Sequence, residues 1–336
     1  MEEVLASAAL VAAGLALLCF GGNWLVGGGE NIARRLRISS FVIGMTVVAY
    51  GTSTPELAAS IAAAGQHSAI ILGNVVGSNI ANIGMVIGVS AILLPLAIGR
   101  SVLRREIPIM IGVSALLVVL SIDGAISPYD GLVLLGGLGI VTFRTVRIIA
   151  GQRAEGAASG TAAAAESGAD DSSSSSSAAS ESILRQSGGR FYAKNVGMLG
   201  AGIGLLYAGA ILTVDHAVIL AETFGLSQKV IGLTVVAIGT SLPELITSMM
   251  AIRRGRHDIG VGNIIGSNIY NVLMIMGVGA VLGGVSISQD VYLDYGIMLA
   301  FGASLFVALK ANIIGRSVGI CLVAGYVAYL GMSLLK

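Results

Sequence analysis

Charged residues are scarce in this chain of 336 residues. They make up only 11% of the sequence, whereas 55% of the residues are hydrophobic. A soluble globular domain carries about 25% charged residues, and so few charges cannot cover the surface of a soluble protein. Apolar runs of about 20 residues recur along the sequence. The composition therefore predicts an integral membrane protein that sits in a lipid bilayer.

Other scarce or missing features exclude further classes. The two cysteines, Cys19 and Cys321, lie in apolar runs near opposite ends, so no disulfide framework is indicated. The net charge of +1 argues against nucleic acid as a partner. The sequence has no HExxH motif, which argues against an intramembrane zinc enzyme. No basic residue precedes the first apolar run, which we expect to be a retained helix and not a cleaved signal.

The apolar runs predict ten transmembrane helices. Their approximate ranges are 4–27, 40–64, 69–98, 107–122, 128–149, 195–215, 228–251, 258–284, 291–310 and 313–335. When ten spans alternate across the membrane, 17 of the 19 Lys and Arg residues fall on one side. The positive-inside rule makes that side cytoplasmic. Both termini are then expected to be extracellular in a multi-pass protein of the cell membrane.

The segment 151–193 has a different composition from the rest of the chain. It is rich in Ala, Ser and Gly and contains six consecutive serines. Such a segment cannot bury enough apolar surface to become ordered. It is predicted to be a flexible cytoplasmic linker, with regulatory ion binding at Asp170 and Asp171 as the alternative. The linker divides the chain into two five-helix membrane repeats, 1–150 and 194–336.

The two halves of the chain repeat each other. Residues 42–60 and 230–248 are identical at 14 of 19 positions, and residues 73–84 and 262–273 at seven of 12. Because each half holds an odd number of helices, the second copy enters the membrane from the opposite side. The predicted fold is an all-α membrane protein of ten transmembrane helices in two inverted-topology repeats. In secondary transporters of this kind the substrate site lies near the midplane, between the repeats.

Two glutamates occupy equivalent positions deep inside apolar spans. A carboxylate at the membrane centre costs about 2.5–3.5 kcal/mol, so the matched pair Glu56 and Glu244 indicates function. Two facing carboxylates repel each other unless they are protonated or bridged by cations. Pro55 and Pro243 precede them and leave backbone carbonyls about one turn earlier without an amide partner. A cation or water can serve such carbonyls.

Hydroxyl and amide groups accompany the glutamates in both repeats. They are Thr52, Ser53, Ser78 and Asn82 in the first, and Thr240, Ser241, Ser267 and Asn271 in the second. Four further asparagines could instead bond across helices, namely Asn74, Asn79, Asn263 and Asn268. All these candidates are oxygen donors, and none is Cys or His. Oxygen ligands suit Ca²⁺ and Na⁺ better than Zn²⁺, and two glutamates neutralise one Ca²⁺.

The paired motifs GTSTPE and GTSLPE, followed by GNVVGSNIAN and GNIIGSNIYN, strongly resemble the two repeats of the Na⁺/Ca²⁺ exchanger branch of the Ca²⁺/cation antiporter superfamily. The resemblance implies alternating-access exchange of cytoplasmic Ca²⁺ for external Na⁺, without a prosthetic group. It also implies a cation-binding shell made of Ala49 and Ala237 (through their carbonyls), Thr52, Ser53, Glu56, Ser78, Asn82, Thr240, Ser241, Glu244 and Ser267. Asn271 completes the candidate set, at a position where several Na⁺/Ca²⁺ exchangers carry an Asp.

The site then holds only two acidic residues, which leaves open whether Na⁺ or H⁺ is the counter-ion. A H⁺-driven Ca²⁺ antiporter of the same superfamily is one alternative, and a Ca²⁺ channel is another. The GTSxPE form of the motif favours the Na⁺ branch, and a single shared midplane site favours exchange over a channel. Glycines concentrate in the first and sixth predicted helices. They predict either a pair of helices that slide together as a gate or tight static packing.

Overall fold

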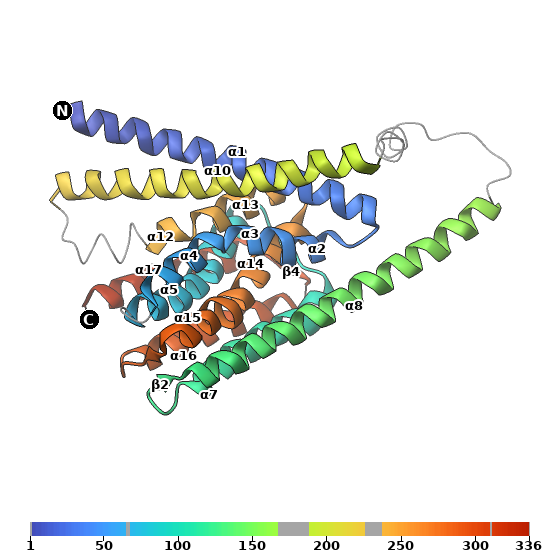
Figure 1. The fold of residues 1–336 in the computed structure, drawn as a ribbon. Coiled ribbons are helices and arrows are strands. Elements are labelled where there is room, and N and C mark those ends of the chain that lie inside the picture. The colour runs from blue at the N-terminus through green and yellow to red at the C-terminus, as the bar shows by residue number, and fades with distance from the viewer. Residues whose placement is uncertain (1, 65–67, 167–187, 226–236, 310, 336) are drawn as a thin grey trace.

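The computed structural model describes residues 2–64, 68–166, 188–225, 237–309 and 311–335 (Figure 1). Its helices overlap all ten predicted spans, and the predicted all-α membrane class is confirmed. Seven described helices are long and apolar enough to cross a membrane. The other three predicted spans are not among these seven helices, each for a different reason. The span at 40–64 is interrupted, α7 at 107–122 is 14 residues long, and the span at 228–251 is described only from residue 237.

The first half runs from α1 to α8. Its elements are α1 (Glu2–Leu36), α2 (Ser40–Ile43), the π-helix η1 (Gly44–Val48), α3 (Ala49–Thr52), α4 (Thr54–Ala63), α5 (Ser68–Ala81), the π-helix η2 (Asn82–Ile87), α6 (Gly88–Leu93), β1 (Leu96–Ala97), the π-helix η3 (Val102–Glu106), α7 (Ile107–Leu120), β2 (Ala125–Ile126) and α8 (Pro128–Glu166).

The second half follows the same order where it is described. Its elements are α10 (Gly188–Thr223), α12 (Ala237–Thr240), α13 (Leu242–Arg253), α14 (His257–Tyr270), the π-helix η5 (Asn271–Met276), α15 (Gly277–Gly283), β3 (Val285–Ser286), α16 (Val291–Ser304), the 3₁₀-helix η6 (Leu305–Leu309), β4 (Ile313–Ile314) and α17 (Arg316–Leu335).

Two of the predicted spans are broken at a serine. Ser53 (φ −83°, ψ 5°) separates α3 from α4, and Ser241 (φ −90°, ψ 3°) separates α12 from α13. Pro55 and Pro243 then fall in the first turn of the new helix, where the missing amide hydrogen removes no intrahelical bond. Each proline therefore starts a helix, and the span at 40–64 is not one continuous helix.

Two small antiparallel sheets join the repeats. β1 pairs with β4, with Leu96 opposite Ile314, and β2 pairs with β3, with Ile126 opposite Val285. Adding 189 to the numbers of β1 gives β3, and adding 188 to those of β2 gives β4, so each sheet is the repeat-related image of the other. The prediction assigned β1 and β4 to the ends of spans 69–98 and 313–335, which is wrong. Before β1, the helix ends because Leu94 is extended (φ −140°, ψ 122°), as is typical of a residue before proline.

α8 continues beyond the predicted end of the first repeat, to Glu166, and projects from the bundle (Figure 1). α10 begins at Gly188. The rest of the predicted linker, with Asp170 and Asp171, lies outside the described residues. The division into 1–150, 151–193 and 194–336 stays a prediction.

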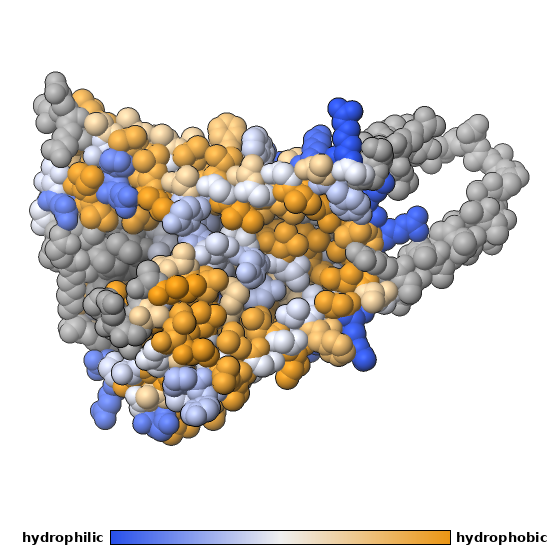
Figure 2. Space-filling model, viewed as in Figure 1, coloured by the Kyte–Doolittle hydropathy of each residue, from blue (hydrophilic) through white to orange (hydrophobic). Residues whose placement is uncertain are grey.

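The most buried helices surround the centre of the bundle. In the most apolar 18-residue windows of Ile70–Leu93 and His257–Gly283, 83% of the residues are buried, whereas the windows of Pro128–Gln152 and Arg316–Leu334 have 11% and 17% of their residues buried. Hydrophobic side chains cover much of the visible flank, and strongly hydrophilic residues gather at the end next to the α8 extension (Figure 2). The peripheral helices thus present an apolar surface to lipid.

Glycines allow α14 to cross the first repeat at close range. A Cβ atom placed on Gly262 would lie 2.6 Å from the carbonyl oxygen of Phe41, and Gly266 meets the backbone of Met45. These two glycines therefore permit close contact between helices. The repeat-equivalent neighbours of Gly73 and Gly77 fall within 226–236, outside the described residues.

α1 and α10 run side by side along one flank of the bundle (Figure 1). Three glycines of α1, spaced seven residues apart, contact α10. Gly14 lies against Gly209, Gly21 against Gly202 and Gly28 against Asn195. A Cβ atom on Gly21 would lie 2.8 Å from the carbonyl oxygen of Gly202, so the two backbones touch. Such contact suits both a gate that moves as one unit and a static pair. Their motion stays a prediction.

Candidate functional site

The site lies where the two broken helices meet. Glu56 is 2% exposed in the first turn of α4, and Glu244 is 1% exposed in the first turn of α13. Their carboxyl groups are close enough to hydrogen bond and to repel each other. A first-turn position favours a negative charge by about 0.3–1 kcal/mol, because the free amides and the helix dipole face it. The breaks at Ser53 and Ser241 therefore help to hold two carboxylates inside the protein.

Hydroxyl groups of each repeat reach residues of the other. Ser53 Oγ donates to Glu244 Oε1 at 3.4 Å. Thr52 Oγ1 lies 3.1 Å from Asn263 Oδ1, 3.4 Å from Ser267 Oγ and 3.2 Å from the carbonyl oxygen of Ala49. Thr52 and Ser267 have two hydroxyl hydrogens for these three contacts, so at least one pair of oxygens faces each other without a shared proton. Such a set is suited to a cation.

Asn82 and Asn271 hold equivalent positions, each at the first residue of a π-helix. Asn271 Nδ2 donates to Asn79 Oδ1 at 3.1 Å, and Asn79 Nδ2 donates to the carbonyl oxygen of Asn268 at 3.2 Å. These two hydrogen bonds fix the orientation of the Asn271 side chain, whose amide oxygen has no partner among the described residues. π-helical turns are rare and are often found at functional sites. No sequence pattern predicted these widened turns.

Several buried polar atoms of the candidate residues have no hydrogen-bond partner within the described part of the chain. They are Glu56 Oε2, Glu244 Oε2, Ser241 Oγ, Asn271 Oδ1 and both amide atoms of Asn82. A buried polar group without a partner costs about 1–3 kcal/mol. Two pairs of these residues are matched between the repeats, Glu56 with Glu244 and Asn82 with Asn271, and each such unpaired group calls for an explanation.

The twelve predicted ligands are placed as follows. Buried are Ala49, Thr52, Ser53, Glu56, Ser78, Asn82, Ser241, Glu244, Ser267 and Asn271, whereas Thr240 is half-buried and Ala237 is the first residue of α12. Direct contacts across the two repeats join Thr52 to Ser267, Ser53 to Glu244 and Glu56 to Glu244. Their role as cation ligands stays a prediction.

The other asparagines support the helices around the site. Asn74 Nδ2 donates to Ser60 Oγ, and Asn263 Nδ2 donates to Ser248 Oγ, both at 3.0 Å. These two bonds are repeat equivalents. The alternative of bonds between helices is thus confirmed for Asn74 and Asn263, and also for Asn79. Asn268 differs, because it donates within its own helix to the carbonyl oxygen of Ile264 at 2.8 Å.

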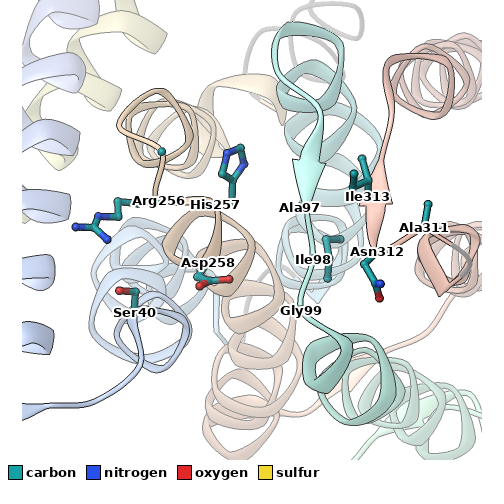
Figure 3. A pocket seen from close by; sticks show the side chains of 11 residues that line it. Ser40, Ala97, Ile98, Gly99, Arg256, His257, Asp258, Ala311, Asn312 and Ile313 are labelled. Carbon is teal, nitrogen blue, oxygen red and sulfur yellow. The ribbon is translucent and has the colours of Figure 1, made fainter.

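A separate polar cavity of about 510 Å³ opens at the end of the bundle that carries Arg254 and Arg256, called the basic end below. None of the twelve candidate ligands is among its described lining residues, which include Ser40, His257 and Asn312 (Figure 3). Arg256 points away from the cavity toward α1, where it bonds to Glu30. This cavity therefore borders the contact between α1 and the rest of the bundle.

Comparisons with known proteins agree with this geometry. The family model described as sodium/calcium exchanger protein matches residues 6–146 and 194–335. The inner membrane protein YrbG of Escherichia coli is 35% identical over 335 residues, covering 98% of this chain and 97% of that protein. The sodium/calcium exchanger MaX1 of Methanosarcina acetivorans is 34% identical over 345 residues, covering 94% and 95%.

Solved structures give the same result for the fold. The sodium-calcium exchanger NCX_Mj, soaked with Na⁺ and without Ca²⁺, matches with a TM-score of 0.77 at 31% identity, covering 98% of this chain and 99% of that one. Its form soaked with Na⁺ and Sr²⁺ matches with a TM-score of 0.76. The fold is therefore the sodium/calcium exchanger fold over almost the whole chain. This chain belongs to the sodium/calcium exchanger family of membrane cation antiporters.

Proposed function

We propose that this protein exchanges Ca²⁺ for Na⁺ by alternating access and extrudes Ca²⁺ from the cell. The observation that carries the proposal is the contact between Glu56 and Glu244, brought together from opposite repeats at the buried centre. Two carboxylates offset the charge of one Ca²⁺, and the oxygens around them are of the kind that Ca²⁺ and Na⁺ prefer. NCX_Mj, which has the same fold, is a sodium-calcium exchanger.

The proposed cation shell consists of the twelve predicted residues. The carboxylates of Glu56 and Glu244 supply the charge. The unpaired oxygens of Asn82, Ser241 and Asn271 face no competing donor among the described residues. Ca²⁺ takes 6–8 oxygen ligands, so the carbonyls of Ala49 and Ala237 and the remaining hydroxyls would complete the coordination.

The asymmetry of the two repeats supports alternating access. Thr247 and Ser248, at the basic end of the site, are buried, and α1 lies over Thr247. The equivalents in α4, at an offset of 188, are Ala59, which is exposed, and Ser60, which is buried like Ser248. The two sides of the site thus differ at the position of Thr247, and this difference supports exchange through a single shared site.

The proposed orientation places the basic end in the cytoplasm. It rests on the excess of Lys and Arg at that end. Both termini would then be extracellular, and residues 151–193 would form a cytoplasmic linker between the repeats 1–150 and 194–336. If more than two Na⁺ are exchanged for one Ca²⁺, each cycle moves net charge. An inside-negative potential then drives Ca²⁺ out, by about 2.3 kcal/mol per charge per 100 mV.

Proton coupling is the second candidate function. Asn271 favours it, because an amide at this position leaves the site with only two acidic residues. Both carboxylates could carry protons as counter-ions. The test is uptake of radioactive Ca²⁺ into proteoliposomes, with the Na⁺, K⁺ and pH gradients imposed one at a time. Uptake against a Ca²⁺ gradient that requires Na⁺ supports the main proposal. Uptake that follows only the pH gradient supports the second, and purely downhill Ca²⁺ flux would indicate a channel.

A further inference from the structure

Three successive polar residues of the second repeat carry oxygens that no described residue hydrogen-bonds. They are Ser241 Oγ, Glu244 Oε2 and Thr247 Oγ1, and the three residues are 0%, 1% and 0% exposed. The spacing of three places each roughly one turn further along α13. Ser248, beside Thr247, is different, because it is bonded to the carbonyl oxygen of Gly260 and to Asn263. The row of unpaired oxygens therefore extends beyond the proposed cation shell by one residue, Thr247.

Two buried helical threonines, Thr247 and Thr213, carry hydroxyls that no described residue hydrogen-bonds. Four other helical threonines donate to the carbonyl four residues earlier, which are Thr46, Thr54, Thr145 and Thr223. Back-bonding of this kind is the ordinary state of a threonine in a membrane helix. Thr247 does not adopt it, so its buried hydroxyl is available to another partner.

The Thr247 hydroxyl faces α1 at the side of α13 that leads to the basic end. A Cβ atom placed on Gly22 would lie 3.3 Å from Thr247 Oγ1 and 3.3 Å from Thr247 Cα. The next residue of α1, Asn23, accepts a hydrogen bond from Arg254, about two turns further along. α1 thus closes over α13 from Thr247 to the basic end.

The first repeat has no counterpart of this oxygen. The residue that corresponds to Thr247, at an offset of 188, is Ala59, which is exposed and has no polar atom in its side chain. The extra oxygen therefore belongs to only one of the two routes by which a cation could reach the glutamates.

We propose that the Thr247 hydroxyl is a transit site for the transported cation, between Glu244 and the basic end, which opens when α1 moves away from α13. The inference rests on the proposed function. A neutral hydroxyl next to a charged site can hold a cation briefly and release it, which suits a step on a path better than a storage site.

The first test is Ca²⁺ transport by Thr247→Val, which keeps the shape of the side chain but removes the oxygen, and by Thr247→Ser, which keeps the oxygen. In proteoliposomes of uniform orientation, Thr247→Val should raise the apparent KM for Ca²⁺ at the basic end by about three- to tenfold. The KM at the opposite end should not change, and Thr247→Ser should stay close to the wild type. Equal changes at both ends, or none at either, would overturn the transit site.

Ser90→Ala is the matched control. Ser90 is also buried, its hydroxyl also has no partner in the described chain, and it lies near the Met249 and Ile252 side of α13. Removing this oxygen should leave both KM values unchanged. A one-sided effect as large as that of Thr247→Val would show that any buried hydroxyl near α13 gives the same result, and would overturn the assignment.

A second test does not depend on transport. In a background with Cys19 and Cys321 replaced by Ala, Thr247→Cys should react with a membrane-impermeant cationic thiol reagent added at the basic end, and not with reagent added at the opposite end. Labelling from the opposite end, or none from either, would overturn the route. Wild-type protein without Na⁺-dependent Ca²⁺ flux would instead contradict the proposed function, and the labelling would still decide whether Thr247 lies on a path.

Discussion

α4 and α13 begin with nearly the same sequence but have different surroundings. Both start after a serine break, with a proline and a buried glutamate in the first turn. Three residues beyond the glutamates, α13 is buried at Thr247, whereas α4 is exposed at the equivalent Ala59. One residue further on, Ser248 and Ser60 are both buried. The difference comes from α1, which packs along α13. Two copies of one motif can therefore differ in burial within one molecule, as the proposed alternating access would require.

The contacts of α1 with the second repeat explain how the covered state is held. Gly22 lies against Thr247, Asn23 accepts from Arg254, and Glu30 pairs with Arg256. Glu30 also pairs with Arg34 on its own helix, at 2.5 Å. The covered side thus combines a close backbone contact near the site with polar contacts at the basic end. The following predictions break or sharpen this comparison, from the largest expected effect to the smallest.

Glu56 in α4 and Glu244 in α13 should contribute equally to Ca²⁺ transport. Glu56→Gln or Glu244→Gln keeps the shape of the side chain but removes half of the charge that offsets Ca²⁺. We expect Ca²⁺ transport to fall at least about 100-fold in either variant, because every 1.4 kcal/mol of lost binding is about tenfold. The measurement is Na⁺-dependent Ca²⁺ uptake. Helix content and elution volume should match those of the wild type, and substantial exchange by either variant would contradict the shared site.

A large residue at Gly22 should disturb the covered side only. A leucine side chain there would push against Thr247, since even a Cβ atom would lie 3.3 Å from its hydroxyl. We expect Gly22→Leu to reduce transport about tenfold or more and to increase thiol labelling of Thr247→Cys from the basic end. Gly204→Leu is the control, because a Cβ atom at Gly204 meets no described atom within 4 Å. Normal transport by Gly22→Leu would show that α1 need not approach α13 so closely.

The pair Glu30 and Arg256 should have a smaller effect. Its side chains are 15% and 31% exposed, and a partly exposed ion pair contributes about 0.2–1 kcal/mol. Glu30→Gln should therefore increase the labelling rate of Thr247→Cys from the basic end by about two- to fivefold, because the uncovered state becomes more populated. Arg256→Gln should raise the rate by a similar factor, and Glu30→Gln combined with Arg256→Gln should raise it no further than either single variant. An effect of the double variant equal to the product of the two single effects would mean that the two charges do not act as a pair.

The smallest expected effect is a change in the form of the pH profile. Asn271→Asp would place a third carboxylate beside Glu56 and Glu244, and three neighbouring negative charges bind protons more readily than two. Exchange by this variant should depend on pH more steeply than exchange by the wild type, with little change in the selectivity for Ca²⁺. The measurement is Na⁺-dependent Ca²⁺ flux between about pH 6 and pH 9. An unchanged profile would place position 271 outside the ion site.

The sequence predicted the features that depend on composition and on the repeat. Apolar runs mark the spans, and the paired motifs by themselves identify Glu56 and Glu244 as partners. The breaks at Ser53 and Ser241 could be anticipated only as irregularities, because a proline can kink a helix or start one. The sheet of β1 and β4 could not be predicted, since two residues per strand carry no periodic signal and their pairing joins distant parts of the chain.

The candidate site, too, could be predicted only in part from the sequence. Equivalent positions in the two repeats predicted which oxygens to consider, but the bond from Asn271 to Asn79 depends on how α5 and η5 cross. The π-helices at Asn82 and Asn271 leave no sequence pattern that distinguishes them from ordinary helix. Thr247 was missed for a related reason. Its partner in the packing is Gly22, more than 200 residues away, and its counterpart in the first repeat is an alanine.

The central claim is that both repeats contribute to one cation site which Ca²⁺ and Na⁺ share. The most direct measurement is equilibrium binding of radioactive Ca²⁺ to the purified protein over a series of Na⁺ concentrations. We expect one Ca²⁺ per chain, an apparent Kd that rises as Na⁺ is added, and loss of this binding in Glu56→Gln and in Glu244→Gln. Undiminished Ca²⁺ binding in either variant, or a Kd that Na⁺ does not alter, would contradict the shared site.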